Sequence, residues 1–460
     1  MQEEGVQLFV GLPIDAVSDC NTINHARAIT AGLKALKLLG CEGVEIPVWW
    51  GIVEKEAMGK YEWSGYLALA KMVQNVGLKL RVSIAFHGSK DLKVPLPQWI
   101  SKIGESQPDI FFTNKSGERY EECLSFGVDV HPVLHGKSPM QVYEGFLESF
   151  RSTFSDFIGS TITDITIGLG PNGELRYPSC PTAKLGEISG AGEFHCHDEY
   201  MLNSLKHHAQ KTGNANWGYG GPHDAPSCVE SPIFNGFFKD NGGSWETPYG
   251  NFFLSWYSSN VIWHGEYLLS IASRIFRDSP VNLSGKIPLL PSWYKMKSHP
   301  AELTAGFYNT HNRDGYDDIA QMFSRYSCKM ILPGMELSDK FQPEGLLSSP
   351  ELLFSQIKKA CKKHNVRVYG ENLKYAGTHN GMDQIQQNLI GDGVKVDLFT
   401  YQRMGAYFFS PEHFPTFTEF VRNLNQSELQ SDDMPDNEQA SRSSLSSVSE
   451  TGKDRQMQEA

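Results

Sequence analysis

Two glutamates, Glu174 and Glu371, stand in the sequence contexts best suited to acid–base chemistry. Glu174 lies in Gly170–Pro178 (Gly-Pro-Asn-Gly-Glu-Leu-Arg-Tyr-Pro), and Glu371 lies in Val368–Asn372 (Val-Tyr-Gly-Glu-Asn). Glycine precedes each of them, and glycine lets backbone and ligand approach closely. Two carboxyl groups across a cleft can cleave a glycosidic bond, because one protonates the leaving oxygen while the other activates water. Taken singly, either glutamate could equally be a surface or salt-bridge residue.

The elements that must position these glutamates are short strand-like runs that alternate with helical patterns. Alternate residues of Lys79–His87, beginning at Leu80, are apolar, which is typical of a strand. Ser349-Pro350-Glu351 predicts the start of a helix, with Ser349 as its N-cap. The eight expected strands are Gln7–Pro13, Gly43–Trp50, Lys79–His87, Thr161–Gly170, Asn282–Leu290, Lys329–Leu337, Arg367–Asn372 and Asp397–Arg403. Helices are expected from Ile29 to Leu39, from Ser349 onward and at about 64–77, 140–159, 198–213, 249–276, 314–327, 382–391 and 411–426.

Eight strand–helix units predict an α/β protein with parallel strands and right-handed crossovers. Closure into a (β/α)8 TIM barrel leaves no strand edge unpaired, so we expect residues 1–425 to form one barrel. Such a barrel needs about 250 residues, and the excess must lie in loops. The Gly/Pro-rich stretches 171–197 and 214–250 follow the fourth strand and its helix. We therefore expect long loops at the C-terminal face, where barrel active sites form.

Composition and charge exclude several classes of partner. The net charge is −12 without any Lys/Arg block, so a nucleic-acid partner is not expected. No run of 18 apolar residues exists, so no membrane span is expected. The eight cysteines form no Cys-x-x-Cys pair, which argues against a disulfide framework or a zinc site. Residues 426–460 are Ser-rich, carry a net charge of −5 and are predicted to be a disordered tail.

Several strings in this sequence resemble the β-amylases of glycoside hydrolase family 14. They include Leu12–Asp15, Gly43–Gly51, Gly170–Pro178, Trp217–Asp224, Phe252–Tyr257, Glu302–Gly306 and Phe399–Tyr401, and the resemblance covers about residues 6–425. It implies a barrel that removes maltose from the non-reducing ends of α-1,4-glucans such as starch, with inversion and without metal or organic cofactor. It also implies that Glu174 is the general acid and Glu371 the general base. The substrate-binding residues that it implies are His87, Asp91, Lys286, Asn372 and Arg403.

The sequence departs from the family pattern at residues that would surround the glutamates. Pro47 replaces an aspartate that binds sugar, and Pro333 replaces a threonine of an inner loop. The lid after the third strand is shortened to His87–Pro95, where Asp91 is a candidate substitute for the lid acid, and Lys374 replaces an apolar contact. The pattern resembles a plant branch of weak or absent activity. Two readings stay open: a glucan-binding or regulatory barrel in starch breakdown, and a working α-1,4-glucan maltohydrolase.

The resemblance also bears on location and partners. The branch is plastidial, which suggests the plastid stroma, and its ligand is starch or maltodextrin, with another amylase as a further candidate partner. The chain opens with Met1-Gln2-Glu3-Glu4 and shows no signal or transit pattern. From the chain alone, without a targeting segment, the cytosol would be expected.

Overall fold

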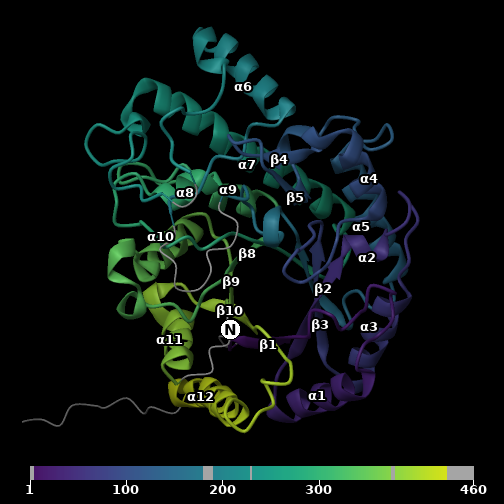
Figure 1. Cartoon of the computed structure of the whole chain (residues 1–460). Coiled ribbons are helices and arrows are strands. Elements are labelled where there is room, and N and C mark those ends of the chain that lie inside the picture. Colours follow the sequence, from purple (N-terminus) through teal and green to yellow (C-terminus); the bar gives the residue numbers. More distant parts are fainter. Residues whose placement is uncertain (1–4, 180–189, 228–229, 374–378, 433–460) are drawn as a thin grey trace, which may run out of the picture.

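Eight parallel strands close into a barrel in the order β1-β10-β9-β8-β7-β6-β3-β2, seen at the centre of Figure 1. The computed structural model describes residues 5–179, 190–227, 230–373 and 379–432. The strands are β1 Gln7–Gly11, β2 Gly43–Trp49, β3 Lys79–Ala85, β6 Ile162–Ile167, β7 Asn282–Lys286, β8 Lys329–Leu332, β9 Val368–Glu371 and β10 Val396–Tyr401. All eight predicted strands are present. The predicted (β/α)8 barrel is confirmed.

Helices follow the strands and pack around the barrel. They are α1 Ala26–Leu39, α3 Ser64–Val76, α5 Pro139–Thr153, α6 Glu199–Lys211, α7 Pro248–Ile275, α9 Asp317–Arg325, α10 Pro350–Lys363, α11 His379–Ile390 and α12 Phe414–Asp432. Local sequence explains their ends. α1 stops at Gly40, whose φ of 87° suits a glycine C-cap. α5 begins with a capping box between Ser138 and Gln141.

The predicted start of α10 is correct, but the predicted cap is wrong. Ser349 makes no side-chain cap hydrogen bond to the helix. Its hydroxyl donates instead to Asp339 Oδ2 at 2.7 Å, and Asp339 Oδ1 accepts from the backbone N–H of Glu351 at 3.1 Å. A carboxylate from ten residues earlier in the same β8–α10 connection therefore caps this helix. A charged acceptor makes a stronger bond to an orphan N–H group than a hydroxyl does.

The loops at the C-terminal ends of the strands hold elements that the sequence did not predict. They are the short helices α2 Trp50–Val53, α4 Gln98–Ser106 and α8 Pro300–Ala305, and a hairpin of β4 Phe111–Thr113 and β5 Arg119–Leu124. The 3-10 turns are η1 Pro108–Ile110, η2 Phe126–Val128, η3 Pro171–Gly173, η4 Ala215–Gly218, η5 Ser244–Glu246, η6 Asp339–Phe341, η7 Glu344–Leu346 and η8 Gly391–Gly393. The hairpin escaped prediction because β5 is polar and partly exposed over most of its length.

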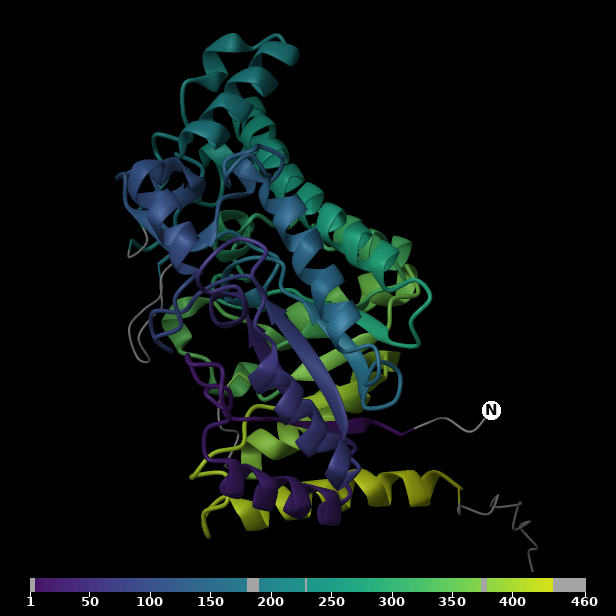
Figure 2. The same ribbon diagram turned by 90° about the vertical axis from the view of Figure 1, so that its right-hand side faces the viewer.

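One long helix carries part of the loop region beyond the barrel wall. α7 has 28 residues and is about 42 Å long, which exceeds what is needed to cover one strand. Figure 2 shows α6 and the first turns of α7, in teal, standing above the barrel. This projection creates surfaces away from the barrel mouth. Among the residues with described structure, no helix combines the length and apolar character that a membrane crossing needs.

The last helix extends past the boundary predicted for the barrel. α12 continues to Asp432, whereas the tail was expected to begin at residue 426. Gln, Glu and Leu in this segment are good helix formers, so helical propensity favours continuation despite the loss of apolar periodicity. Residues 433–460 lie outside the described residues. Their disorder stays a prediction.

Polar residues replace part of the hydrophobic core inside the barrel. A small apolar cluster of Phe9, Ile331, Tyr369 and Leu398 comes from four adjoining strands. The guanidinium of Arg81 lies over the Tyr369 ring, with 5.8 Å from Cζ to the ring centroid. Charged groups are therefore buried inside the barrel next to its apolar filling, and each needs a partner.

Candidate active site

Glu371 lies at the C-terminal end of β9 and is held by two cations. Its Oε1 is 3.1 Å from Arg81 Nη2, and its Oε2 is 2.5 Å from Lys286 Nζ. The side chain is 3% exposed. Burial alone would raise the pKa of Glu371, but Lys286 and Arg81 outweigh burial and the pKa lies below its ordinary value. Glu371 is therefore an ionised carboxylate with a cation on each oxygen.

Arg81, which sequence analysis missed, organises the inside of the barrel below Glu371. It projects from β3, is fully buried, and donates from Nε and Nη2 to Thr166 Oγ1 at 3.1 Å each. Its Nη1 donates to Thr400 Oγ1 at 2.6 Å. In the sequence, Arg81 stands between Leu80 and Val82, on the face of β3 that also carries Ser83 and Ala85. An arginine on the inward face of a barrel strand predicts a buried acidic partner.

Glu174 follows β6 on the turn η3 and is brought next to the same lysine. Leu175 N donates to Lys286 O at 2.9 Å, and Glu174 Oε2 is 3.5 Å from Arg176 Nη1. Its side chain is 13% exposed. Burial raises the pKa of Glu174 above its ordinary value, although Arg176 and Lys286 oppose that shift. The two glutamates thus have pKa values shifted in opposite directions, as a general acid and a general base require.

The turn that presents Glu174 depends on Gly170. Its φ of 148° and ψ of −153° suit glycine, and a Cβ there would lie 2.8 Å from Glu174 O and 3.1 Å from Arg176 O. Gly170→Ala should therefore lower the free energy of unfolding by about 1–3 kcal/mol, as measured by urea denaturation. Gly345→Ala is the matched control, because its Cβ would meet nothing within 4 Å, and it should change stability by less than about 0.5 kcal/mol. Equal losses in the two variants would contradict the strain argument.

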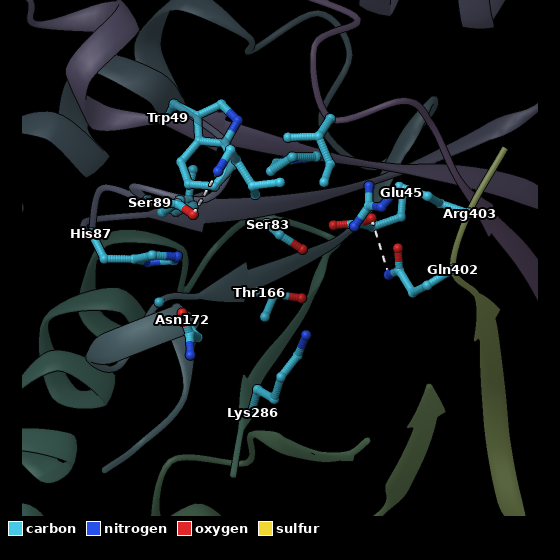
Figure 3. Close-up of a pocket in the computed structure, with 17 residues that line it drawn as sticks. Glu45, Trp49, Ser83, His87, Ser89, Thr166, Asn172, Lys286, Gln402 and Arg403 are labelled. Carbon is cyan, nitrogen blue, oxygen red and sulfur yellow. Dashed lines mark hydrogen bonds between the residues drawn. The ribbon is translucent and has the colours of Figure 1, made fainter. Parts of the chain in front are cut away.

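A pocket of about 190 Å³ opens beside this pair at the barrel mouth. Figure 3 shows Trp49, His87 and Ser89 on one side, Glu45, Gln402 and Arg403 on the other, and Lys286 between them. The lining residues are Ile14, Glu45, Pro47, Trp49, Ser83, Ile84, Ala85, His87, Ser89, Leu92, Thr166, Gly168, Asn172, Gly173, Lys286, Gln402 and Arg403. Of the predicted substrate-binding residues, His87, Lys286 and Arg403 meet here. Neither Glu174 nor Glu371 is among the lining residues.

Two predicted residues do not line the pocket. Asn372 is buried behind it, where its side chain donates to Gln402 O at 2.9 Å and accepts from Gln402 N at 2.8 Å. It therefore supports the segment that presents Arg403. Asp91 is exposed and is not among the lining residues, although Ser89 and Leu92 on either side of it are. The structure does not bring Asp91 into the pocket.

The prolines predicted to alter the site differ in position. Pro47 lines the pocket and supplies no side-chain donor or acceptor there. Pro333 is buried just after β8 and is not among the lining residues. The short loop after β3 is closed on itself, because Ser89 N donates to Val94 O at 2.7 Å and Val94 N to Ser89 O at 2.9 Å. Lys374 lies outside the described residues.

Buried polar groups in the pocket lack partners within the described part of the chain. They include Trp49 Nε1 and His87 Nδ1, and the two rings meet edge to face with centroids 5.4 Å apart. Burial, together with the nearby Lys286, lowers the pKa of His87 to about 3, so the imidazole is neutral. Glu45, also missed from sequence, accepts from Gln402 Nε2 at 3.3 Å. Such groups are suited to a polar, uncharged ligand or to water.

Among the described residues, no group of three or more His, Cys, Asp and Glu side chains could hold a metal ion. The arrangement around Lys286 is that of a carboxyl pair at the C-terminal face of a closed barrel, which is the layout of a glycoside hydrolase.

Comparison with known proteins identifies the family. The family model described as glycosyl hydrolase family 14 matches residues 9–429, and the chain belongs to this family. It is 57% identical over 449 residues to inactive beta-amylase 9 of Arabidopsis thaliana, covering 98% of this chain and 83% of that protein. It is 40% identical over 436 residues to the chloroplastic beta-amylase 1 of the same plant, covering 92% and 76%. The crystal structure of the catalytic domain of beta-amylase from Paenibacillus polymyxa superposes with a TM-score of 0.75 at 25% identity, covering 92% of this chain and 99% of that one.

Proposed function

We propose that this protein is a glucan-binding or regulatory barrel of starch breakdown whose hydrolytic turnover is weak or lost. The observation that carries the proposal is the pairing of both oxygens of Glu371 with Arg81 and Lys286. A general base needs a lone pair directed at the attacking water and a pKa that allows it to accept the proton. Each oxygen of Glu371 has a cation as a partner that an attacking water must compete with, and the same cations lower its pKa, which makes it a weaker proton acceptor.

The size and lining of the pocket support the same proposal. Pockets for drug-sized ligands usually span about 300–1,000 Å³, whereas this one has about 190 Å³. The pocket is therefore small for a ligand of the size of a disaccharide. Pro47 and the self-bonded loop Ser89–Val94 form part of the wall. A relative named an inactive beta-amylase, 57% identical, agrees with this proposal.

A fully active β-amylase is the second candidate function, and one observation favours it. The pKa of Glu174 is raised and that of Glu371 is lowered, which is the division an inverting glycosidase uses. In that reaction Glu174 would give its proton to the leaving glycosidic oxygen. Glu371 would take a proton from the water that attacks the anomeric carbon from the opposite face, which inverts its configuration.

Maltose release from soluble starch by the purified protein separates the two candidates. We expect the wild type to release maltose no faster than Glu174→Gln, in which the carboxyl proton donor is absent. The Glu174→Gln chain serves as the matched control, because it keeps the size and most hydrogen bonds of the side chain. A wild-type rate at least 100-fold above that control would contradict the proposal and establish the active enzyme.

The site of action and the partners belong to the same proposal. Relatives with chloroplastic in their names, at 40% and 38% identity, support the plastid stroma. We propose α-1,4-glucan, as starch or maltodextrin, as the ligand, and another amylase as a protein whose rate this chain changes. Adding the purified protein to an active plant amylase on starch granules tests the second point. An unchanged amylase rate over a tenfold range of added protein would remove it.

A further inference from the structure

A second hollow lies outside the barrel, on the projection that α6 and α7 form in Figure 2. It has a volume of about 940 Å³ and runs between α6, α7 and the turn η2. The residues that line it share none with the pocket at the barrel mouth. Nothing in the carboxyl pair or its pocket accounts for this groove.

Buried polar bonds fix the three walls of the groove to one another. Ser125, at the start of η2, donates to Asp198 Oδ2 at 2.9 Å, and Asp198 Oδ1 also caps α6 by accepting from Met201 N at 2.9 Å. Asp129, at the end of η2, bonds His264 of α7 at 2.7 Å. Because these contacts are buried, the turn is anchored to both helices. Opening or closing the groove would require them to break.

The two helices are also joined directly at the floor. Trp256 of α7 donates from Nε1 to Ser204 Oγ of α6 at 3.2 Å, and Trp256 is 3% exposed. The groove is therefore a preformed cavity rather than a gap between mobile parts. A preformed site binds its ligand without the ordering cost of assembling its walls.

The lining combines exposed ring surface with hydrogen-bonding side chains, among them Lys211 and the histidines His131, His207 and His208. Trp263 of α7 is 44% exposed at one edge, and the ring of Tyr200 of α6 lines the cavity with it. The carboxamides of Asn203 and Asn260 and the hydroxyl of Ser259 provide donors and acceptors. Among the described side chains that line the groove, none is acidic. Flat apolar faces with amide and hydroxyl groups between them match a chain of pyranose rings, which offer C–H faces and hydroxyl rims.

Trp263 belongs to a pair of exposed aromatic rings on α7. Tyr267 lies one turn further along α7, is 37% exposed, and meets Trp263 edge to face with centroids 5.4 Å apart. The two rings therefore expose aromatic surface on one side of α7, of which Trp263 lines the groove.

We infer that this groove binds a linear α-1,4-glucan chain outside the barrel, with Trp263 as the ring platform. The inference rests on the proposed glucan ligand and names where the chain is held. The volume is roughly five times that of the barrel pocket, so several sugar rings fit in the groove where the pocket lacks space. A surface of this kind would hold the protein on starch without hydrolysis.

Affinity electrophoresis of the full chain in gels containing amylopectin, with isothermal titration of maltoheptaose, tests the inference. We expect Trp263→Ala to weaken binding at least tenfold, because the ring platform is removed from an exposed position that the fold does not need. Phe341→Ala is the matched control, since Phe341 is an aromatic side chain 58% exposed that does not line the groove, and it should bind as the wild type does. Trp263→Tyr should restore part of the affinity.

Each other outcome has a defined meaning. Binding that survives Trp263→Ala but is lost in Arg403→Ala would assign the glucan to the barrel pocket, which overturns this inference and leaves the proposed function standing. No binding by the wild type would overturn both. If Trp263→Ala binds glucan as the wild type does but no longer changes the rate of an added amylase, the groove is a protein contact and the inference is overturned. Asn203→Ala, at an exposed position, gives a second variant should Trp263→Ala not fold.

Discussion

Replacing Arg81 with methionine should lower the free energy of unfolding by about 3–5 kcal/mol, because it leaves a buried carboxylate with one of its two cations. Arg81 is fully buried and makes its bonds to Glu371, Thr166 and Thr400 within the barrel. Removing one partner of a buried ion pair costs this much, whereas removing both together is often nearly neutral. Guanidinium or urea unfolding followed by circular dichroism measures the loss.

A double-mutant cycle with Glu371→Gln isolates the contribution of the pair. In Arg81→Met/Glu371→Gln the buried charge and its partner are both gone, so the combined loss should be smaller than the sum of the single losses by at least about 1 kcal/mol. Arg176→Met is the matched control. Arg176 also pairs with a site glutamate, Glu174, at 3.5 Å, but the side chains of both residues are partly exposed. This substitution should lower the free energy of unfolding by no more than about 1 kcal/mol. Additive effects at Arg81 and Glu371, within about 0.5 kcal/mol, would show that the two side chains are not energetically coupled.

The ion pair between Arg81 and Glu371 also connects the stability of the protein with the proposed loss of turnover. An arginine that satisfies a buried carboxylate stabilises the ionised form of Glu371 in the resting protein. The attacking water must compete with that arginine for the carboxylate, so the interaction favours the ground state over the transition state. Interactions of this kind do not accelerate the chemical step. Glu371 therefore contributes to the stability of the barrel interior whether or not it acts as a base.

Sequence reasoning predicted the barrel well because its signals are local. Each strand appears as a short apolar run, and glycine at Gly40 or proline at Pro350 marks helix ends through backbone geometry alone. The hairpin β4–β5 was missed because its polar second strand gains stability from tertiary contacts rather than from its own pattern. The cap of α10 was assigned to Ser349 because the competing acceptor, Asp339, lies ten residues earlier in the same connection, outside the local cap pattern.

The sequence predicted the site residues that lie at strand ends, but not the positions of residues that lie in loops. His87, Lys286 and Arg403 come at or just after strands, so the barrel brings them together as expected. Asp91 lies in a six-residue loop whose direction is set by its own hydrogen bonds, and it is exposed instead. Arg81 was missed because its role follows from which strand faces it across the barrel. That neighbour is known only once the barrel is closed.

His87 should make this protein less stable as pH falls below 6.5, and the substitution His87→Gln should reveal that contribution. Burial and Lys286 lower its pKa to about 3 in the folded protein, against about 6.5 when unfolded. Below pH 6.5 the unfolded chain binds a proton at this histidine that the folded chain does not. The stability that the neutral ring contributes is therefore present above pH 6.5 and is lost as pH falls toward 3, at about 1.4 kcal/mol per pH unit.

The test is the difference in stability between the wild type and His87→Gln, because other titrating groups cancel in that difference. Asp198, for example, has its pKa raised by burial to about 7 and acts in the opposite direction in both proteins. We expect His87→Gln to be less stable than the wild type at pH 8 and to recover about 2 kcal/mol of that deficit between pH 6.5 and pH 5, by urea unfolding. His311→Gln, the same substitution at an exposed histidine outside the pocket, is the matched control. A deficit of His87→Gln that stays constant from pH 8 to pH 5 would mean that the ring takes up its proton without unfolding, and that the wall of the pocket admits charge.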